Sequence, residues 1–247
     1  MKNSSKNEKI LILDFGSQVT QLIARRVRES GVYSEIFPYT KWEEGLKKIK
    51  PKGIILSGGP ASTIDSSSPQ VSLEILNSDV PVLGICYGQQ TLCSQLGGKV
   101  EHSTKREFGR ANIKIIGKSD FFRDFENNKE NEPVWMSHGD KVTKLPEGFS
   151  VIAKSENAPF AAIANEDKRV YGVQFHPEVV HTPNGSKMLE NFTHHICGCS
   201  GEWTIESFRE TAIERIKKQV GDGTVVCGLS GGAVSYTHLT LPTMRTV

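Results

Sequence analysis

Short apolar runs alternate with amphipathic stretches through the first hundred residues of this 247-residue chain. The apolar runs Ile10–Leu13, Gly53–Leu56 and Val80–Ile85 are each followed by a turn that contains glycine, which is typical of buried strands. Helices are predicted at Gln18–Glu29 and Gly88–Leu96. Strands that alternate with helices run parallel and have both faces of their sheet covered. The pattern therefore predicts an α/β fold with a mostly parallel central sheet and flanking helices.

The middle of the chain has a different pattern, in which turns rather than helices separate the predicted strands. These strands are expected at Ala111–Ile116, Pro133–Met136, Phe149–Ala153, Ala161–Ala164 and Val170–Phe175. Antiparallel neighbours need only short connections, whereas parallel neighbours need long crossovers. We therefore expect a small antiparallel sheet in addition to the central one.

Charge and hydropathy exclude two classes of partner. The chain has 30 Lys and Arg residues against 28 Asp and Glu residues, a formal net charge of +2, without the basic excess typical of nucleic-acid binding. No apolar run approaches the roughly 20 residues that span a bilayer. The first apolar run, Ile10–Leu13, is too short for the core of a signal peptide. We expect a cytoplasmic protein that binds neither nucleic acid nor a membrane.

The segment Val82–Gln90 places Cys86 in a Gly-x-Cys-x-Gly motif between a predicted strand and a predicted helix. This is the thiol counterpart of the Gly-x-Ser-x-Gly elbow, a strained turn that needs glycines because a Cβ atom would clash. The turn would put the thiol at a helix N-terminus, where the helix dipole favours the thiolate. The amide of Tyr87 could then face a developing oxyanion. The alternative is an inert buried thiol, which is how we interpret Cys93 on the following helix.

A later strand leads into His176-Pro177-Glu178. Residues before proline are extended, and side chains two apart leave an extended segment on the same face. Glu178 could therefore hold one ring nitrogen of His176 and leave the other nitrogen free for a thiol. A surface histidine beside a solvated glutamate is the alternative. However, a cysteine followed far downstream by histidine and glutamate is the order expected of a triad that folding assembles.

Two more strand ends are candidate ligand-binding loops. The segment Ser57-Gly58-Gly59-Pro60 could present the amide of Gly59 as a second oxyanion donor, because glycine lets the backbone approach a ligand closely. The segment Trp135–Asp140 is interpreted as a strand end with a polar turn that could hold a small amino acid. Taken alone, each segment is better interpreted as an ordinary turn.

These motifs, in this order, resemble the triad-type (class I) glutamine amidotransferases. The residues that carry the resemblance are Gly58-Gly59-Pro60, Gly84–Gln90 and Gln174–Glu178. More narrowly, the chain resembles the amidotransferase part of the GMP synthases, through Asp14–Gln18, Trp135–Asp140 and Gly228–Gly232. The resemblance extends from about residue 9 to residue 232. It implies a flavodoxin-like α/β fold.

The resemblance also implies roles for individual residues. Cys86, His176 and Glu178 would be the catalytic triad, and the amides of Gly59 and Tyr87 would form the oxyanion hole. L-glutamine would be the substrate, with no cofactor for its hydrolysis and no metal. Its implied contacts are Gly58, Gln90, Ser137, His138, Gly139 and Asp140. In the family, ammonia passes to a synthetase domain that uses ATP and Mg²⁺ to convert XMP to GMP, and the full-length enzymes are expected to be homodimers.

The resemblance predicts a domain organisation as well. We expect a disordered N-terminus at 1–8, the amidotransferase domain at 9–200, and a linker helix with the start of an ATP pyrophosphatase domain at 201–232. Ser230, Gly231 and Gly232 would belong to its nucleotide loop. The family continues this loop with Val-Asp-Ser, whereas this chain continues with Ala-Val-Ser into a tail, 233–247, that resembles nothing in the family. We therefore expect a truncated synthetase domain and no synthesis of GMP by this polypeptide alone.

Other functions remain open at this stage. The chain could serve a different synthase, although the Gly228–Gly232 loop argues against that. It could be a docking or regulatory domain that is dormant without its synthetase, or a cysteine peptidase of similar fold. A zinc site at His194–Cys199 is disfavoured, because a single residue separates the two cysteines where structural zinc sites have two to four. Five cysteines without a secretion signal also argue against a disulfide framework.

Overall fold

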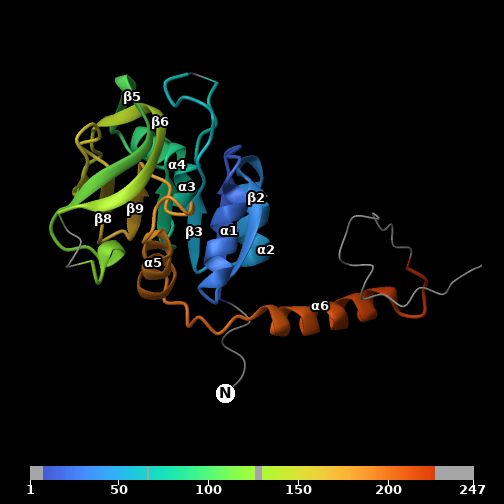
Figure 1. The fold of residues 1–247 in the computed structure, drawn as a ribbon. Coiled ribbons are helices and arrows are strands. Elements are labelled where there is room, and N and C mark those ends of the chain that lie inside the picture. Colours follow the sequence, from blue (N-terminus) through green and yellow to red (C-terminus); the bar gives the residue numbers. More distant parts are fainter. Residues whose placement is uncertain (1–7, 66, 126–129, 226–247) are drawn as a thin grey trace, which may run out of the picture. The chain divides into compact units, whose positions relative to one another are not determined.

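The computed structural model describes residues 8–65, 67–125 and 130–225. The chain divides into a unit that ends at Thr204 and a second unit that begins at Ile205. The first unit contains a nine-stranded sheet in the order β2-β1-β3-β4-β9-β8-β7-β5-β6. Figure 1 shows this sheet running from the blue strand β2 at one end to the green ribbon of β5 and β6 at the other. The predicted α/β class is confirmed.

The first five strands of that order are parallel. They are β2 (Tyr33–Pro38), β1 (Lys9–Asp14), β3 (Gly53–Leu56), β4 (Val82–Ile85) and β9 (Val170–Val173). Every residue of β3, β4 and β9 is buried. Because both faces of these strands are covered, their sequences are nearly continuous apolar runs, which is why the sequence predicted them well.

Two apolar clusters cover the two faces of the sheet, and successive side chains of β1 belong alternately to one cluster and to the other. Ile10 and Ile12 belong to one cluster, whereas Leu11 and Leu13 belong to the other. The first cluster also receives side chains from α1 (Thr20–Glu29), η3 (Asp120–Phe122), α5 (Gly185–Glu190) and the π-helical turn η5 (Asn191–Ile196). The second receives them from α2 (Trp42–Ile49), α3 (Leu73–Leu76) and α4 (Tyr87–Gln95), and the turn η2 (Tyr39–Lys41) precedes α2. Helices therefore flank the sheet on both sides.

The remaining strands are antiparallel and extend the same sheet. They are β8 (Ala162–Asn165), β7 (Ser150–Lys154), β5 (Lys99–Ile115) and β6 (Glu132–Lys144). β5 pairs with β7 only through Lys114 and Ile115, and it pairs with β6 through Lys99–His102 and Glu107–Ile113. The expected smaller antiparallel sheet is thus the outer part of one mixed sheet.

The segment Trp135–Asp140 lies inside β6, so the expectation of a strand end with a polar turn is wrong. Burial alternates without interruption along β6, with Met136, His138 and Asp140 buried. Alternation with a period of two keeps the segment extended although its side chains become polar. In the ladder of β5 with β6, Glu107 lies opposite His138. This pairing supplies hydrogen-bond partners for the backbone of the segment.

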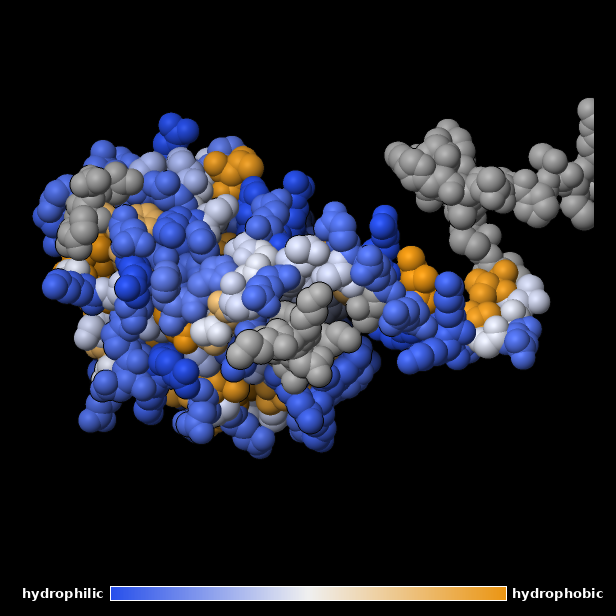
Figure 2. All heavy atoms as spheres, turned by 90° about the horizontal axis from the view of Figure 1, so that it is seen from below, coloured by the Kyte–Doolittle hydropathy of each residue, from blue (hydrophilic) through white to orange (hydrophobic). Residues whose placement is uncertain are grey.

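The second unit contains the helix α6 (Ile205–Val220). A helix is predicted within 201–232, and the apolar residues Ile205, Phe208, Ile213 and Ile216 of α6 are exposed. Figure 2 shows orange apolar atoms among blue hydrophilic side chains on this helix. Within 8–65, 67–125 and 130–225, no helix is long and apolar enough to cross a membrane. The predicted nucleotide loop Ser230-Gly231-Gly232 and the tail 233–247 lie outside the described residues, and the predicted domain boundaries stay predictions.

Candidate active site

Cys86 occupies the predicted elbow between β4 and α4. Its backbone has φ 53° and ψ −106°, which is a strained conformation for a residue with a side chain. A Cβ atom on Gly84 would lie 2.6 Å from the carbonyl oxygen of Gly88, and one on Gly88 would lie 2.4 Å from that of Leu56. Both glycines are therefore required for the turn. The amide of Cys86 donates to the carbonyl oxygen of Val173 (2.7 Å), which ties the elbow to β9.

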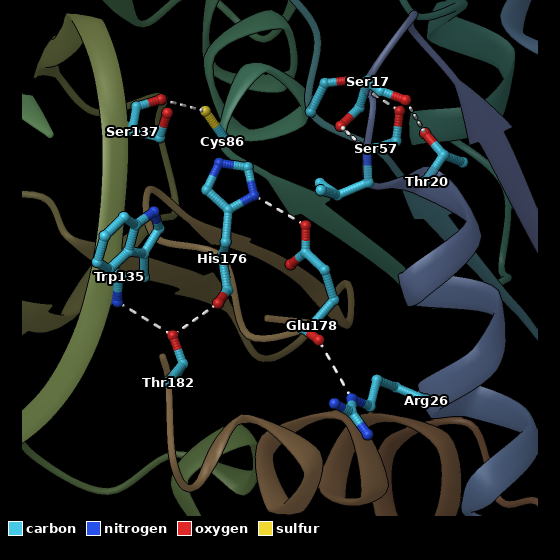
Figure 3. A network of polar contacts seen from close by, with 12 residues as sticks. Ser17, Thr20, Arg26, Ser57, Cys86, Trp135, Ser137, His176, Glu178 and Thr182 are labelled. Carbon is cyan, nitrogen blue, oxygen red and sulfur yellow. Dashed lines mark hydrogen bonds and ion pairs between the residues drawn. The ribbon is translucent and has the colours of Figure 1, made fainter. Parts of the chain in front are cut away.

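β9 leads directly to the candidate base. His176 Nδ1 lies 2.8 Å from Glu178 Oε1, and both side chains are buried. Figure 3 shows the imidazole ring lying between Cys86 and the Glu178 carboxylate. Because β4 and β9 are adjacent and parallel, the end of each strand places its side chain at the same edge of the sheet. The structure brings the three predicted triad residues together.

The surroundings of His176 favour its protonated form. Burial opposes a charge on the ring, but hydrogen bonds with Cys86 and Glu178 outweigh burial and raise the pKa of His176 to about 10. The imidazole therefore carries a second proton at neutral pH. A proton held next to a thiol can be given to a group that leaves from an adduct on the sulfur.

A cavity of about 460 Å³ opens on one side of Cys86. The predicted oxyanion donors Gly59 and Tyr87 line it. So do most of the residues predicted to contact the substrate, namely Gln90, Ser137, His138, Gly139 and Asp140. Gly58 is not among the lining residues and lies deeper, where a Cβ atom would approach His176 Cε1 to 3.3 Å.

A second cavity of about 320 Å³ also reaches Cys86. His176 lines this cavity but not the first one, and so does the segment 16–19 that follows β1. Gly59 and Ser137 line both cavities. Cys86 thus lines two cavities, and the candidate base His176 lines only one of them.

Side-chain hydrogen bonds hold the wall of the first cavity. Gln90 Nε2 donates to the carbonyl oxygen of Asp140 (2.9 Å) and to Gln174 Oε1 (3.2 Å). Asp140 Oδ1 lies 2.7 Å from His102 Nδ1. The amide nitrogen of Gln90 is therefore engaged by the protein itself, and its contribution to this site is to tie α4 to β6.

His138 differs from His176 although it also lies beside a glutamate. Its Nδ1 donates to the carbonyl oxygen of Asp140 (3.0 Å), and its Nε2 lies 3.4 Å from Glu107 Oε2. Burial is the main influence on the pKa of His138, which is lowered. The ring is therefore neutral at neutral pH.

The candidate oxyanion loop is held by its neighbour Ser57. The Ser57 hydroxyl donates to the carbonyl oxygen of Gly58 (2.8 Å) and accepts from the amide of Phe15 (2.9 Å). A Cβ atom on Gly59 would lie 2.7 Å from the carbonyl oxygen of Phe15, so the loop packs too closely for any other residue. The roles of the Gly59 and Tyr87 amides in holding an oxyanion stay predictions.

The other described cysteines line neither of these two cavities. Burial raises the pKa of Cys93 to about 12 and that of Cys199 to about 11, and it also raises the pKa of Cys197. Cys93 is fully buried, as predicted for a core residue. Both ring nitrogens of His194 face carbonyl oxygens, at 2.8 Å from Cys199 and 3.0 Å from Ser30. Across the residues that the structure describes, no three acidic, histidine or cysteine side chains are grouped to hold a metal.

Several residues at the site escaped the sequence analysis. The sequence analysis does not identify His102, which lies in β5 and lines the first cavity together with Phe108. Glu107 faces His138 from the opposite strand. The signal for all three would have been the register of β5 against β6, which a single sequence does not specify. Gln174, whose Nε2 lies 3.8 Å from Cys86 Sγ, was quoted in a motif but given no role.

Known proteins have sequences similar to this one. The family described as glutamine amidotransferase class-I matches residues 11–196. The GMP synthase (glutamine-hydrolyzing) of Phenylobacterium zucineum is 59% identical over 235 residues, which are 95% of this chain and 45% of that protein. The protein of the same description from Zymomonas mobilis is 57% identical over 230 residues, 93% of this chain and 44% of that protein. The chain thus spans less than half the length of these curated relatives.

Solved structures share the fold. A Thermoplasma acidophilum protein described as one subunit of a GMP synthase matches with a TM-score of 0.66 and 29% identity, over 83% of this chain and 98% of that chain. A Thermotoga maritima glutamine amidotransferase matches with a TM-score of 0.62 and 18% identity, over 78% of this chain and 99% of that chain. The second likeness concerns the fold alone.

Proposed function

This chain belongs to the class I glutamine amidotransferases, and on that basis we propose that it hydrolyses L-glutamine to glutamate and ammonia with Cys86, His176 and Glu178 as its catalytic triad. The observation that carries the proposal is the position of His176. Its buried ring lies between Cys86 and Glu178 (Figure 3), with Nδ1 2.8 Å from Glu178 Oε1, and it lines a cavity that also reaches Cys86.

The first half-reaction makes a thioester. The Cys86 sulfur attacks the side-chain carbonyl carbon of glutamine, and the carbonyl electrons move onto oxygen. The amides of Gly59 and Tyr87 stabilise that oxyanion. When the oxyanion collapses, the carbon–nitrogen bond breaks and His176 gives its proton to the departing nitrogen, so that ammonia leaves. His176 faces the second cavity, which supports departure of ammonia on that side.

The second half-reaction releases glutamate. Neutral His176 takes a proton from a water molecule, whose oxygen attacks the thioester carbonyl carbon. The carbon–sulfur bond then breaks and the sulfur leaves as a thiolate, which restores the starting pair. Glu178, through Nδ1, keeps the ring in one tautomer and stabilises the imidazolium in both half-reactions. No cofactor takes part in this hydrolysis.

The first cavity is the proposed site of the amino-acid part of glutamine. Ser137, His138, Gly139 and Asp140 present backbone and side-chain polar groups along one wall of it. Gln90 supports that wall through Asp140. The Gly58 carbonyl is held by Ser57 and supports the loop rather than touching the substrate.

The acceptor of ammonia is proposed from the relatives' names. Because the matched curated proteins are called GMP synthases, we propose that the ammonia aminates XMP to GMP in a synthetase domain that uses ATP and Mg²⁺. Ser230, Gly231 and Gly232, predicted to touch the nucleotide, lie outside the described residues. The homodimeric state of the whole enzyme is proposed on the same family resemblance.

The test is release of glutamate and ammonia from L-glutamine by the purified chain, beside the variant Cys86→Ala. We expect turnover by the chain and none by Cys86→Ala. Equal turnover by both would contradict the proposal. If both are silent, alkylation of Cys86 by a glutamine analogue that carries an electrophile distinguishes a dormant triad from an absent one. Failure of that reagent to modify Cys86 at all would contradict the proposal.

A further inference from the structure

The hydroxyl of Thr182 joins the candidate base to the strand that forms the cavity wall. It accepts a hydrogen bond from the amide of Trp135 (3.0 Å) and donates one to the carbonyl oxygen of His176 (2.7 Å). The residue is buried. Figure 3 shows the hydroxyl between the two backbones, below the imidazole ring.

This bridge replaces a direct backbone bond. In an antiparallel ladder, a hydrogen-bonded pair of residues exchanges two N–H···O bonds. Met136 and Phe175 form an isolated antiparallel bridge, and the neighbouring pair is Trp135 with His176. One of the two bonds is direct, from the His176 amide to the carbonyl oxygen of Trp135 (3.0 Å). The second bond, from the Trp135 amide to the His176 carbonyl oxygen, is replaced by the two hydrogen bonds of the Thr182 hydroxyl.

The turn that carries Thr182 is itself closely packed. The Thr182 amide donates to the carbonyl oxygen of Val179 (3.1 Å), and its carbonyl accepts from the amide of Gly185 (3.0 Å). A Cβ atom on Gly185 would lie 1.9 Å from the carbonyl oxygen of Pro177, so the start of α5 is pressed against the residue that follows His176. The hydroxyl is thus held in place by the backbone around it.

The strand on the other side of the bridge carries a group that touches the nucleophile. Two residues beyond Trp135, the carbonyl oxygen of Ser137 lies 3.5 Å from Cys86 Sγ. The Thr182 hydroxyl therefore sets the spacing between the backbone of His176 and the strand that contacts the thiol. A change in that spacing moves the ring relative to Cys86 and Glu178 together.

We propose that Thr182 is a positioning residue, whose hydroxyl fixes the His176 backbone so that the ring can contact Cys86 and Glu178 at the same time. This inference rests on the proposed function. It requires the hydroxyl itself rather than the bulk of the side chain, because a methyl group cannot bridge an amide and a carbonyl. Its loss leaves two buried backbone groups without this partner.

The experiment compares Thr182→Val, which keeps the volume, with Thr182→Ser, which keeps the hydroxyl. The first measurement is the rate of Cys86 alkylation by the glutamine-analogue electrophile between pH 6 and 10, and the second is kcat and KM for glutamine. We expect Thr182→Val to lower the alkylation rate and kcat about ten- to hundredfold and to shift the pH profile, with KM little changed. We expect Thr182→Ser to restore all three toward the wild type.

Thr193→Val is the matched control. Thr193 is also fully buried, and its hydroxyl donates to the carbonyl oxygen of Glu190 (3.2 Å), which lies outside both cavities. Cys86 of the Thr193→Val variant should be alkylated at the wild-type rate. If Thr182→Val does not fold, as judged by circular dichroism, Thr182→Ala gives the same comparison with a smaller side chain.

Two results would overturn the inference. One is a hydroxyl-free variant that folds and keeps the wild-type rate and pH profile. The other is a Thr182→Ser variant as slow as Thr182→Val. Both leave the proposed function standing, because the wild type is still alkylated at Cys86. A wild-type chain that the reagent does not modify contradicts the proposed function and this inference together.

Discussion

Two histidine–glutamate pairs lie at the same site, and they have opposite properties. His176 and Glu178 are two residues apart in the chain, and their nearest atoms are 2.8 Å apart. His138 and Glu107 come from opposite strands, and their nearest atoms are 3.4 Å apart. The pKa of His176 is raised to about 10, whereas that of His138 is lowered.

The difference shows that a neighbouring carboxylate does not by itself make a histidine basic. Burial opposes protonation in both rings. For His176, the second nitrogen faces the Cys86 thiol, which can take a negative charge, so two acidic groups share the imidazolium. For His138, the second nitrogen donates to a neutral carbonyl oxygen, and one carboxylate at longer range does not compensate for burial. The group that faces the second ring nitrogen therefore determines whether the imidazole is protonated.

The largest expected difference between the two pairs is in activity, when each histidine is replaced by asparagine. His176→Asn should slow glutamine hydrolysis by about 10³-fold, because the general acid and base is lost. His138→Asn keeps a group that can donate to the carbonyl oxygen of Asp140, so its loss should stay below about tenfold. Steady-state glutamate release and the alkylation rate of Cys86 measure both. Similar losses from the two substitutions would show that the rings have equivalent roles.

The next effect comes from neutralising each carboxylate. Glu178→Gln removes the charge that stabilises the imidazolium. It should lower kcat about ten- to hundredfold, which corresponds to the free energy of a hydrogen bond to a charged group. It should also move the pKa of His176 down toward its ordinary value, which a pH profile of alkylation detects. A profile that keeps the wild-type midpoint would contradict this role of Glu178.

Glu107→Gln is the paired substitution on the other histidine. Because His138 is neutral, it has little charge for Glu107 to stabilise. We expect kcat to be unchanged and KM for glutamine to change less than about tenfold. The kinetic constants of the purified variant test this, and a loss in kcat as large as that of Glu178→Gln would remove the distinction between the pairs.

The smallest effect is on stability, and it has opposite signs for the two rings. The raised pKa of His176 stabilises the fold below its ordinary pKa of 6.5, and this contribution is lost as the pH rises toward about 10. The lowered pKa of His138 does the reverse, so the fold loses stability as the pH falls below 6.5. Urea unfolding at several pH values measures both.

Each histidine variant should remove one of these trends. The stability gap between the wild type and His176→Asn should shrink from pH 6.5 to 10. The free energy of unfolding of His138→Asn should increase relative to that of the wild type as the pH falls from 6.5 to 5. Gaps that do not change with pH would mean that neither ring titrates as the geometry indicates.

The parallel half of the fold was predictable because its strands are buried on both faces. β3 and β4 are continuous apolar runs that end in glycine turns, and these features need no knowledge of partners. The long strands β5 and β6 were underestimated because polar side chains interrupt the apolar pattern where they line the cavity. Their backbone stays extended since each supplies the hydrogen-bond partners of the other.

The grouping of Cys86, His176 and Glu178 was predictable for a similar reason. Each lies at the end of a recognisable strand, and adjacent parallel strands bring their ends together. The contacts of Thr182 and Glu107 were not predictable. The contacts of Thr182 depend on how the turn before α5 packs against β6. Those of Glu107 depend on the alignment of β5 with β6, whose ladder is irregular between His102 and Glu107 in a way that local sequence does not encode.

The position of β9 between β4 and β8 has a consequence for biosynthesis. The strands β5 to β8 are made after β4 and before β9, yet they leave room for β9 to pair directly with β4. A chain growing on the ribosome therefore contains Cys86 before His176, the proposed base, has been made. The pairing of β9 with β4 joins segments that are far apart in the chain, and such contacts slow folding. If the proposed triad is correct, Cys86 has no base beside it until β9 inserts, and glutamine hydrolysis requires the completed sheet.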